Sequence, residues 1–169
     1  VNVVNRTGGG GVVGHSAIAS AAPDGYTIGM ITVEISMMHW QGLTELNPTS
    51  YTPLALVNAD PAGFTVRADS PYKSVREVLD YARANPGKVN FGSPQIGTVG
   101  HLAGELLKSS QNIDIVHVPF QGATAAIKEV ATGNVEMLFV ALPPAIGQIQ
   151  AGAVRALAVS TPERASVIP

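Results

Sequence analysis

Residues 74–160 alternate between helix-like and strand-like segments, and this alternation constrains the fold more than any other feature of the sequence. Short apolar segments suited to strands lie at residues 89–92, 113–118, 137–140 and 155–159, and helical patterns separate them. Parallel strands need a crossover of this kind, whereas antiparallel strands can be joined by a short turn. The alternation therefore predicts an α/β fold with βαβ units, right-handed crossovers and a parallel sheet.

The helices in this region have recognisable ends. Ser74-Val75-Arg76-Glu77 is a capping box, in which Ser74 caps the helix and Glu77 reaches back to the free N–H of the cap. Gly133 is a suitable C′ residue for a helix over residues 123–132. Leu142-Pro143-Pro144 opens a further helix, because proline is favoured in a first helical turn.

Residues 89–102 have the pattern of a strand, a glycine-rich turn and the first turn of a helix. Thr98 is a good N-cap, and Ser93 and Thr98 place hydroxyl donors beside the helix start. A helix N-terminus has free N–H donors and a partial positive charge, and glycine lets a ligand approach the backbone closely. The stretch therefore predicts an anion site without a formal cation, suited to a carboxylate or phosphate. The alternative is an ordinary strand–helix turn with a capped helix.

Three turns follow predicted strands, at Ser93, Phe120 and Leu142. Ligands of parallel α/β sheets sit beyond the carboxyl ends of the strands. We therefore expect these turns to converge on one crevice.

The sequence before residue 74 predicts shorter elements. We expect a helix over residues 12–22 and a buried strand over residues 26–33, which are apolar nearly throughout, as a strand inside a parallel sheet requires. Further strands are expected at residues 1–4, 54–57 and 64–66.

Composition excludes several classes of function. The net charge is −2 and only 13% of residues are charged, which argues against a nucleic-acid partner. No apolar stretch is long enough to span a membrane, and the absence of cysteine excludes thiolate chemistry. The histidines lack i,i+3 or i,i+4 spacing, so we expect no metal site, and we interpret His101 and His117 as structural residues. No nucleophile motif or carboxylate pair indicates an enzyme, and no cofactor is expected.

One motif supports a different class. Gly9, Gly11 and Gly14 match the G-x-G-x-x-G spacing of a dinucleotide site, and Glu34 follows at the distance of an acid that binds ribose. The match lies within a glycine run, where it arises easily, and the predicted helix behind it is short. The alternatives are a dinucleotide-binding enzyme and a flexible surface or hinge loop.

Short motifs along nearly the whole chain follow the order of a known family. They are Val4-Asn5-Arg6, Ala22-Pro23-Asp24-Gly25-Tyr26-Thr27, Pro53-Leu54-Ala55-Leu56-Val57, Lys73-Ser74-Val75-Arg76-Glu77, Asn85-Pro86-Gly87-Lys88-Val89-Asn90-Phe91-Gly92-Ser93, Gly97-Thr98, His101-Leu102-Ala103-Gly104-Glu105, Ile115-Val116-His117-Val118-Pro119-Phe120, Leu142-Pro143 and Arg155-Ala156-Leu157-Ala158-Val159. With these motifs the chain resembles the Bug-type solute receptors of tripartite tricarboxylate transporters, which are periplasmic solute-binding proteins.

The resemblance implies a type II periplasmic-binding-protein fold, with two α/β lobes that close on a ligand by a hinge motion. It implies a partial first lobe at residues 1–62, a nearly complete second lobe at 63–158, and a return strand or linker to the first lobe at 159–169. We interpret the chain as a segment of a longer protein, without the signal peptide and without both ends of the first lobe. The implied partners are a small organic carboxylate and membrane transporter subunits, with no direct membrane insertion.

The resemblance also implies which residues bind the carboxylate. Carried onto this chain, the second-lobe site corresponds to Ser93, Gly97, Thr98, Gly122 and Ala123, and Thr32 and Asn58 are candidates at the lobe junction. The family often has a basic residue where Gln121 stands, and Asp-Asn where Val140-Ala141 stands. Without that Asp, an amino group has no acceptor, so we expect a dicarboxylate or aromatic carboxylate without an amino group. A carboxylate sensor that is not a transport receptor is a further alternative.

Overall fold

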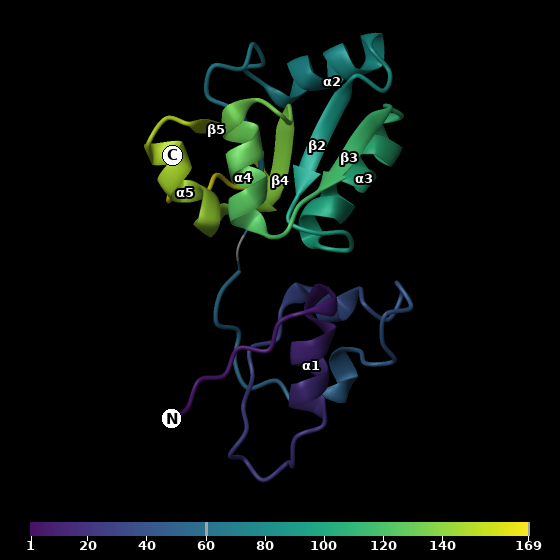
Figure 1. Cartoon of the computed structure of the whole chain (residues 1–169), viewed down its shortest axis with the longest axis vertical. Helices are drawn as coiled ribbons and strands as arrows, with labels where there is room; N and C mark the ends of the chain where they lie inside the picture. The colour runs from purple at the N-terminus through teal and green to yellow at the C-terminus, as the bar shows by residue number, and fades with distance from the viewer. Residues whose placement is uncertain (60, 169) are drawn as a thin grey trace. The chain divides into compact units, whose positions relative to one another are not determined.

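The computed structural model describes residues 1–59 and 61–168. The chain forms two compact units, Val1–Val57 and Asn58–Pro169 (Figure 1). The lobe boundaries expected from the resemblance, 1–62, 63–158 and 159–169, stay a prediction, because the units are defined by packing within this chain alone.

The second unit is built on a five-stranded sheet with the order β3-β2-β4-β1-β5. Its elements in chain order are β1 (Ala62–Arg67), α2 (Val75–Ala84), β2 (Val89–Ser93), α3 (Val99–Gln111), β3 (Ile115–Pro119), α4 (Ala123–Thr132), β4 (Met137–Ala141), α5 (Leu142–Gln150) and β5 (Val154–Val159). The predicted alternation is confirmed, and the helix expected over residues 123–132 has those bounds.

The direction of one strand differs from the expected all-parallel sheet. Strand β2 pairs in parallel with β3 and β4, whereas β1 lies antiparallel to both β4 and β5. The sheet is therefore mixed, with β1 inserted between two strands that both run opposite to it. The apolar pattern of β1 showed that it is a strand, but alternation of side chains between faces is the same in either direction.

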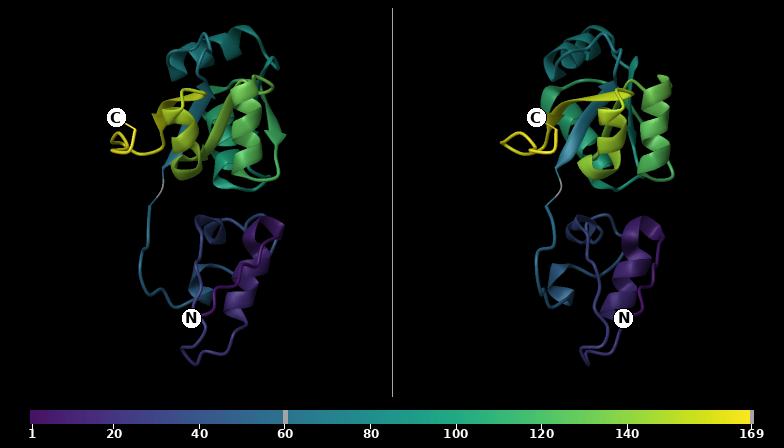
Figure 2. Two further views of the ribbon diagram at one scale, coloured as in Figure 1. Left: turned by 60° about the vertical axis from the view of Figure 1, so that its left-hand side comes forward. Right: turned by 90° about the vertical axis from the view of Figure 1, so that its left-hand side faces the viewer.

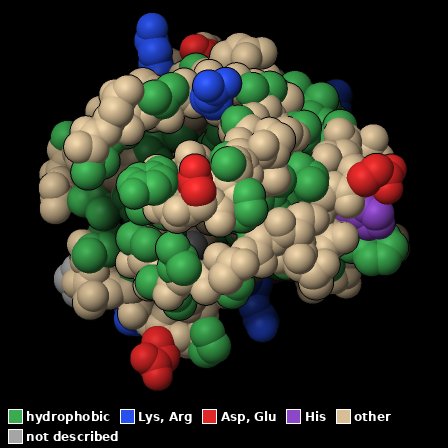
Figure 3. All heavy atoms as spheres, turned by 90° about the horizontal axis from the view of Figure 1, so that it is seen from below, with side chains coloured by type: hydrophobic (Ala, Val, Ile, Leu, Met, Phe, Trp, Pro, Cys, Tyr) green, Lys and Arg blue, Asp and Glu red, His purple; other side chains and the backbone are tan. Residues whose placement is uncertain are grey.

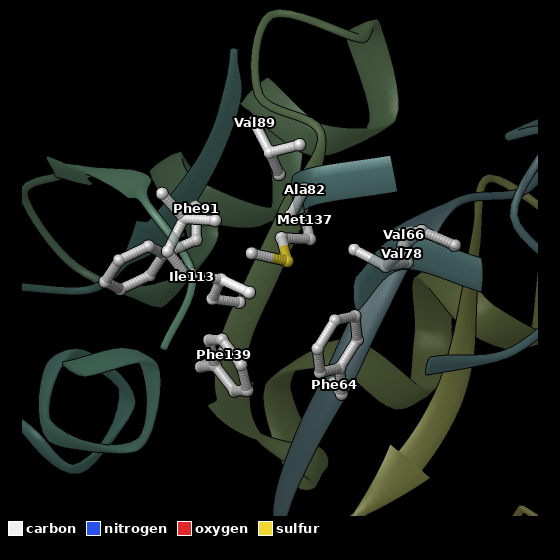
Figure 4. Close-up of a cluster of buried hydrophobic side chains, with 10 residues drawn as sticks. Phe64, Val66, Val78, Ala82, Val89, Phe91, Ile113, Met137 and Phe139 are labelled. Carbon is white, nitrogen blue, oxygen red and sulfur yellow. The ribbon is translucent and has the colours of Figure 1, made fainter. Parts of the chain in front are cut away.

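Helices cover both faces of the sheet (Figure 2), and an apolar layer lies between the helices and the sheet on each face. Helices α2 and α3 cover the face that contains Phe64, Phe91 and Phe139, and Figure 4 shows these rings around Met137. Helices α4 and α5 cover the other face. Consecutive residues of β4 alternate between the layers, so this central strand is buried on both sides from Met137 to Val140.

Helix α2 begins as the capping box predicted, with one difference. The Glu77 N–H donates to the Ser74 hydroxyl over 3.3 Å. The Glu77 carboxylate accepts from the Lys73 N–H over 2.6 Å rather than from the Ser74 N–H. The side chain thus satisfies a donor one residue earlier than the motif implies.

The first unit contains helix α1 (Val12–Ala19) and three short 3-10 turns, η1 (Gly9–Gly11), η2 (Val33–Ser36) and η3 (Pro48–Ser50). The strands expected at residues 1–4, 26–33 and 54–57 were wrong, because all three segments lie outside any sheet among the described residues. Tyr26 is 94% exposed and Ile28 75% exposed. An apolar run becomes a strand only where a neighbouring strand accepts its backbone hydrogen bonds, and no described residue provides one.

Candidate functional site

The loops after β2 and β3 lie together at the carboxyl edge of the sheet. Ser93 and Pro119 form the last residue pair of these neighbouring parallel strands. The Phe120 N–H donates to the Ser93 carbonyl over 3.0 Å, and the Gly122 N–H donates to the Pro94 carbonyl over 2.8 Å. The starts of α3 and α4 therefore lie at the same edge, which Figure 1 shows.

Helix α3 approaches the sheet closely through two glycines. A Cβ at Gly100 would lie 2.2 Å from the Phe139 carbonyl oxygen, and a Cβ at Gly104 would lie 2.1 Å from the Phe91 ring. The two glycines are four residues apart and share one helix face. They hold the N-terminal half of α3 against the middle of β2 and β4.

The β2–α3 loop is organised around one carbonyl oxygen. The Gln95 oxygen accepts from the Thr98 hydroxyl over 2.7 Å, from the Ser93 hydroxyl over 3.1 Å and from the Thr98 N–H over 3.4 Å. Gly97 has a φ of +80°, a conformation that favours glycine. Thr98 occupies the N-cap position of α3, but its hydroxyl makes no cap hydrogen bond. It therefore shapes the loop rather than closing the helix end.

Backbone N–H groups dominate the polar chemistry at this edge. The first three N–H groups of an α-helix have no acceptor within the helix, which applies to residues 99–101 of α3 and 123–125 of α4. Helix α5 offers fewer donors, because Pro143 and Pro144 lack an N–H and the Leu142 N–H donates to Pro61. Residues 94–100, 120–125 and 141–145 contain no Lys, Arg, Asp or Glu. The edge thus combines two positive helix ends with no formal charge, which suits an anion.

A stack of aromatic rings lies beneath the β2–α3 loop. The His101 and His117 ring centroids are 4.2 Å apart, and His117 also lies against Phe91 at 4.8 Å. Burial lowers the pKa of His117, the neighbouring His101 lowers it further, and Glu105 acts weakly in the opposite direction. His117 is therefore held in its neutral form. The expectation that both histidines have hydrogen-bonded structural roles is confirmed by their bonds to Gly97 and Ser93.

The Ser93 hydroxyl and His117 Nε2 are 2.8 Å apart, which is the spacing of a nucleophile and its base. Ser93 is fully buried, however, and its hydroxyl also donates toward the Gln95 carbonyl. No carboxylate orients His117 among the interactions that the structure describes. The pair therefore stabilises the end of β2 and has no access to a substrate.

The structure brings five of the seven predicted site residues together. Gly97 and Thr98 lie in the β2–α3 loop, Gly122 and Ala123 lie at the start of α4, and Ser93 lies beneath them. The Gly122 N–H already donates to Pro94, so Ala123 and the two residues after it provide the free donors of α4. Contact of these residues with a ligand stays a prediction.

The other two predicted residues belong to different segments of the chain. Asn58 is the exposed first residue of the second unit. Thr32 belongs to the first unit, where its N–H donates to His15 Nε2 over 3.1 Å. His15 Nδ1 lies 2.7 Å from the Gly11 carbonyl, so the buried imidazole joins the glycine turn to residue 32. The lobe-junction role of Thr32 and Asn58 stays a prediction.

The dinucleotide alternative fails on its local structure. Such a site requires a strand before the glycines and a second strand that ends near the acid. Gly9, Gly11 and Gly14 follow an extended segment outside any sheet, and Glu34 lies in the 3-10 turn η2. A Cβ at Gly14 would lie 2.8 Å from the Arg6 carbonyl oxygen, so this glycine serves local packing.

Within residues 1–59 and 61–168, no group of His, Cys, Asp and Glu side chains is arranged to hold a metal ion. None of the helices described here has the length and apolar character to cross a membrane. A cavity of about 340 Å³ lies beside Arg83 and Gln111, away from the carboxyl edge. A second cavity of about 300 Å³ lies beside the last residues of β5 and the segment that follows that strand, within residues 156–168.

Comparison with solved structures identifies the class of protein. A structure described as a periplasmic transporter aligns with a TM-score of 0.83 at 34% identity, covering 94% of this chain and 54% of that one. Rpa4515 from R. palustris, solved with adipate, aligns at 0.76 with 29% identity over 91% of this chain and 52% of its own. MatC from Rhodopseudomonas palustris, solved with malate, aligns at 0.77 with 26% identity over 93% and 54%. The fold is therefore that of a periplasmic binding protein, as the resemblance implied.

Sequence comparison gives the family. The chain belongs to the family described as tripartite tricarboxylate transporter family receptor, because the sequence model of that family matches residues 1–169. A UPF0065 protein from the tcbD-tcbE intergenic region of Pseudomonas sp. (strain P51) is 32% identical over all of this chain and 51% of its own length. BugT of Bordetella pertussis is 28% identical over all of this chain and 53% of its own length. The chain thus spans about half the length of these relatives, and its family is one of periplasmic receptors rather than enzymes.

Sequence reasoning did not find the contributions of Gln95, Gly100 and Gly104. The signal for Gly100 and Gly104 was present, since two glycines four residues apart mark a helix face that approaches another backbone closely. The role of Gln95 had no signal, because it is the backbone carbonyl that accepts the hydrogen bonds.

Proposed function

We propose that this chain is the part of a periplasmic receptor that binds a small organic carboxylate at the carboxyl edge of its sheet. The observation that carries the proposal is the pairing of two helix N-termini, α3 and α4, across loops that hydrogen bond to one another. The relatives solved with adipate and malate support a carboxylate as the ligand. Binding and release need no bond to be broken, which agrees with the buried Ser93.

The proposed contacts are the residues expected from the sequence. The free N–H groups at the start of α3 and of α4, from Ala123 onward, would bind carboxylate oxygens, and the Gly97–Thr98 turn would close one side. Ser93 and Gly122 would act by holding the two loops together, because their polar groups already have partners in the protein. Thr32 and Asn58 would contact the ligand from outside this group.

For the ligand class, we propose a dicarboxylate or aromatic carboxylate without an amino group. Val140 is buried beneath α4 and α5, and Ala141 has no polar side chain, so neither offers an acceptor to an ammonium group. Isothermal titration would compare succinate, adipate, malate and benzoate with aspartate and glutamate. An amino acid that binds more tightly than its deaminated analogue would exclude this preference.

The site itself is tested by removing single donors. Ala123→Pro deletes one N–H at a helix position that accepts proline well, and Ala123→Ser at the same position keeps the N–H. A hydrogen bond to a charged group contributes about 1.5–3 kcal/mol, so the proline variant should weaken binding by about tenfold or more. Equal affinity of the two variants, with melting temperatures unchanged, would place the ligand elsewhere.

Thr98→Val tests the contribution of the β2–α3 loop to ligand binding. It removes the hydroxyl that donates to Gln95, so we expect a weaker ligand complex. Thr132→Val is the matched control, because its hydroxyl donates to Lys128 at the opposite end of α4. The control should bind as the wild type does, and equal loss in both variants would indicate a general effect on folding.

The proposed partners are the membrane subunits of a tripartite transporter. The family supports this role, and the alternative of a sensor shares the same carboxylate site. Uptake of labelled malate or adipate by proteoliposomes with those subunits would test it. Uptake that does not depend on the added receptor would favour the sensor.

A further inference from the structure

An imidazole joins the β2–α3 loop of the candidate site to the helix that follows it. His101, in the first turn of α3, accepts a hydrogen bond at Nδ1 from the Gly97 N–H over 3.1 Å. The bond connects the left-handed residue of the loop to the helix that follows it. Because Nδ1 accepts a hydrogen bond here, the neutral ring carries its proton on Nε2.

The titratable groups that face the His101 ring determine the effect of adding a second proton to it. Glu105, one turn along α3, has a carboxylate oxygen 4.0 Å from His101 Nε2. His117 of β3 lies beside the ring, with the centroids 4.2 Å apart and the ring planes tilted by 32°. The facing parts of β2 and β4, residues 89–93 and 137–141, contain no titratable side chain, and neither do loop residues 94–98. Glu105 and His117 are therefore the titratable groups that face it.

Protonation of His101 would turn Nδ1 from an acceptor into a donor. Two N–H groups would then face one another across the Gly97 contact, and this bond between the loop and α3 would be lost. The new charge would lie beside Glu105, which offsets it, and beside the neutral His117. The main consequence for the site is therefore the lost bond between the loop and α3 rather than an added positive charge.

We propose that His101 is a positioning residue for the carboxylate site and a proton-controlled release switch. The neutral ring holds the β2–α3 loop in the conformation that presents its donors, and protonation opens the loop and releases the ligand. This inference rests on the proposed function for its release step. Its loop step concerns the protein alone and can be measured without a ligand.

Nuclear magnetic resonance of the ¹⁵N-labelled chain tests the loop step. At about pH 8, long-range ¹H–¹⁵N spectra should show His101 with its proton on Nε2. On titration to about pH 5.5, the range in which histidines change charge, the Gly97 amide should shift with the same midpoint as the His101 ring. A proton on Nδ1 at the higher pH, or a Gly97 amide that ignores the His101 titration, would overturn the proposal.

Titration with malate and with adipate tests the release step. Both acids stay largely ionised above about pH 6, so a loss of affinity between about pH 8 and pH 6 belongs to the protein. We expect the wild type to lose affinity over this interval. His101→Asn supplies a non-titrating oxygen in place of Nδ1, so it should bind within about threefold of wild type at the higher pH and lose the pH dependence.

Two further variants separate the positioning role of His101 from the effect of its protonation. His101→Phe keeps an aromatic ring beside His117 but has no acceptor, so it should bind more weakly than wild type at about pH 8 and show no pH dependence of its own. His39→Asn removes a histidine of the first unit and should keep the wild-type pH profile. A His101→Asn variant with the full pH dependence, or a His101→Phe variant that binds as wild type, would overturn the switch. If neither acid binds the wild type at any pH, the proposed function fails together with the release step, and the loop step is decided by the nuclear magnetic resonance result.

Discussion

Of the 22 buried hydrophobic residues among those the structure describes, 20 lie in the unit from Asn58 and two, Ile35 and Met38, lie in Val1–Val57. The exposed large hydrophobic residues show the opposite distribution, with 14 of 19 in the first unit. In Figure 3, hydrophobic side chains are spread over the visible face, with few charged groups among them. Both units have apolar, strand-like sequence, so composition does not explain the difference.

The difference follows from whether each segment has a partner. In the second unit every strand pairs with at least one neighbour, and helices cover both faces. In the first unit, the apolar run over residues 26–33 pairs with no strand among the described residues. Its small core gathers around α1, where Tyr51 donates to the His15 carbonyl over 3.0 Å and burial raises the pKa of that tyrosine. A sheet provides many long-range contacts at once, and a single short helix does not.

The largest expected effect is a core truncation in the second unit. Phe91 is fully buried among α3, His117 and Phe139, so Phe91→Ala should cost about 3–5 kcal/mol in the free energy of unfolding. Leu56 in the first unit is 86% exposed, so Leu56→Ala should change stability by less than about 0.5 kcal/mol. Urea denaturation of both variants measures this. Comparable losses would mean that the first unit buries Leu56, which would remove the contrast.

A smaller effect tests how closely α3 approaches the sheet. Gly104→Ala places a methyl group 2.1 Å from the Phe91 ring, and overpacking of this kind costs about 1–3 kcal/mol. Gly147→Ala in α5 is the matched control, because nothing lies within 4 Å of its Cβ position. The control should gain up to about 1 kcal/mol from helix propensity. If both variants are stabilised, the Phe91 ring can move aside, and α3 does not pack tightly against the sheet at Gly104.

Each unit has a capped helical segment, so the effect of removing a cap on stability can be compared between the two units. The Ser74 hydroxyl caps α2, whose buried face contacts the core, so Ser74→Ala should cost about 1 kcal/mol. Asn47 caps the 3-10 turn η3 in the same manner, accepting from the Thr49 N–H over 2.9 Å. This turn buries no residue, so Asn47→Ala should have less effect on the unfolding midpoint. An equal or larger loss at Asn47 would show that η3 stabilises the first unit.

The smallest expected effect is a pH dependence that arises in the second unit. Burial and His101 lower the pKa of His117 below 6.5, so the unfolded chain binds more protons than the folded one once the pH falls below that value. The contribution of His117 to stability is therefore complete above about pH 6.5 and decreases as the pH falls toward the folded-state pKa. Unfolding free energies measured at several pH values should decrease less steeply for His117→Gln. An unchanged slope would assign the effect to other groups.

Local sequence determined much of the second unit. The helix from Ala123 to Thr132, the capping residue Ser74 and the strand positions depend on periodicity and on short-range hydrogen bonds, so they could be predicted. The meeting of the β2–α3 and β3–α4 loops also followed from the sequence, because parallel strands bring their carboxyl ends to one edge. The structural roles of His101 and His117 were predicted as well, without their partners.

Tertiary structure decided the rest. The antiparallel direction of β1, the burial of Ser93 and the close approach at Gly104 depend on residues far away in the sequence. The run over residues 26–33 has the composition of a buried strand, yet it stays extended and exposed because no described strand pairs with it. An apolar pattern encodes which face of a segment prefers burial, whereas the partner that provides burial and backbone hydrogen bonds is a property of the assembled fold.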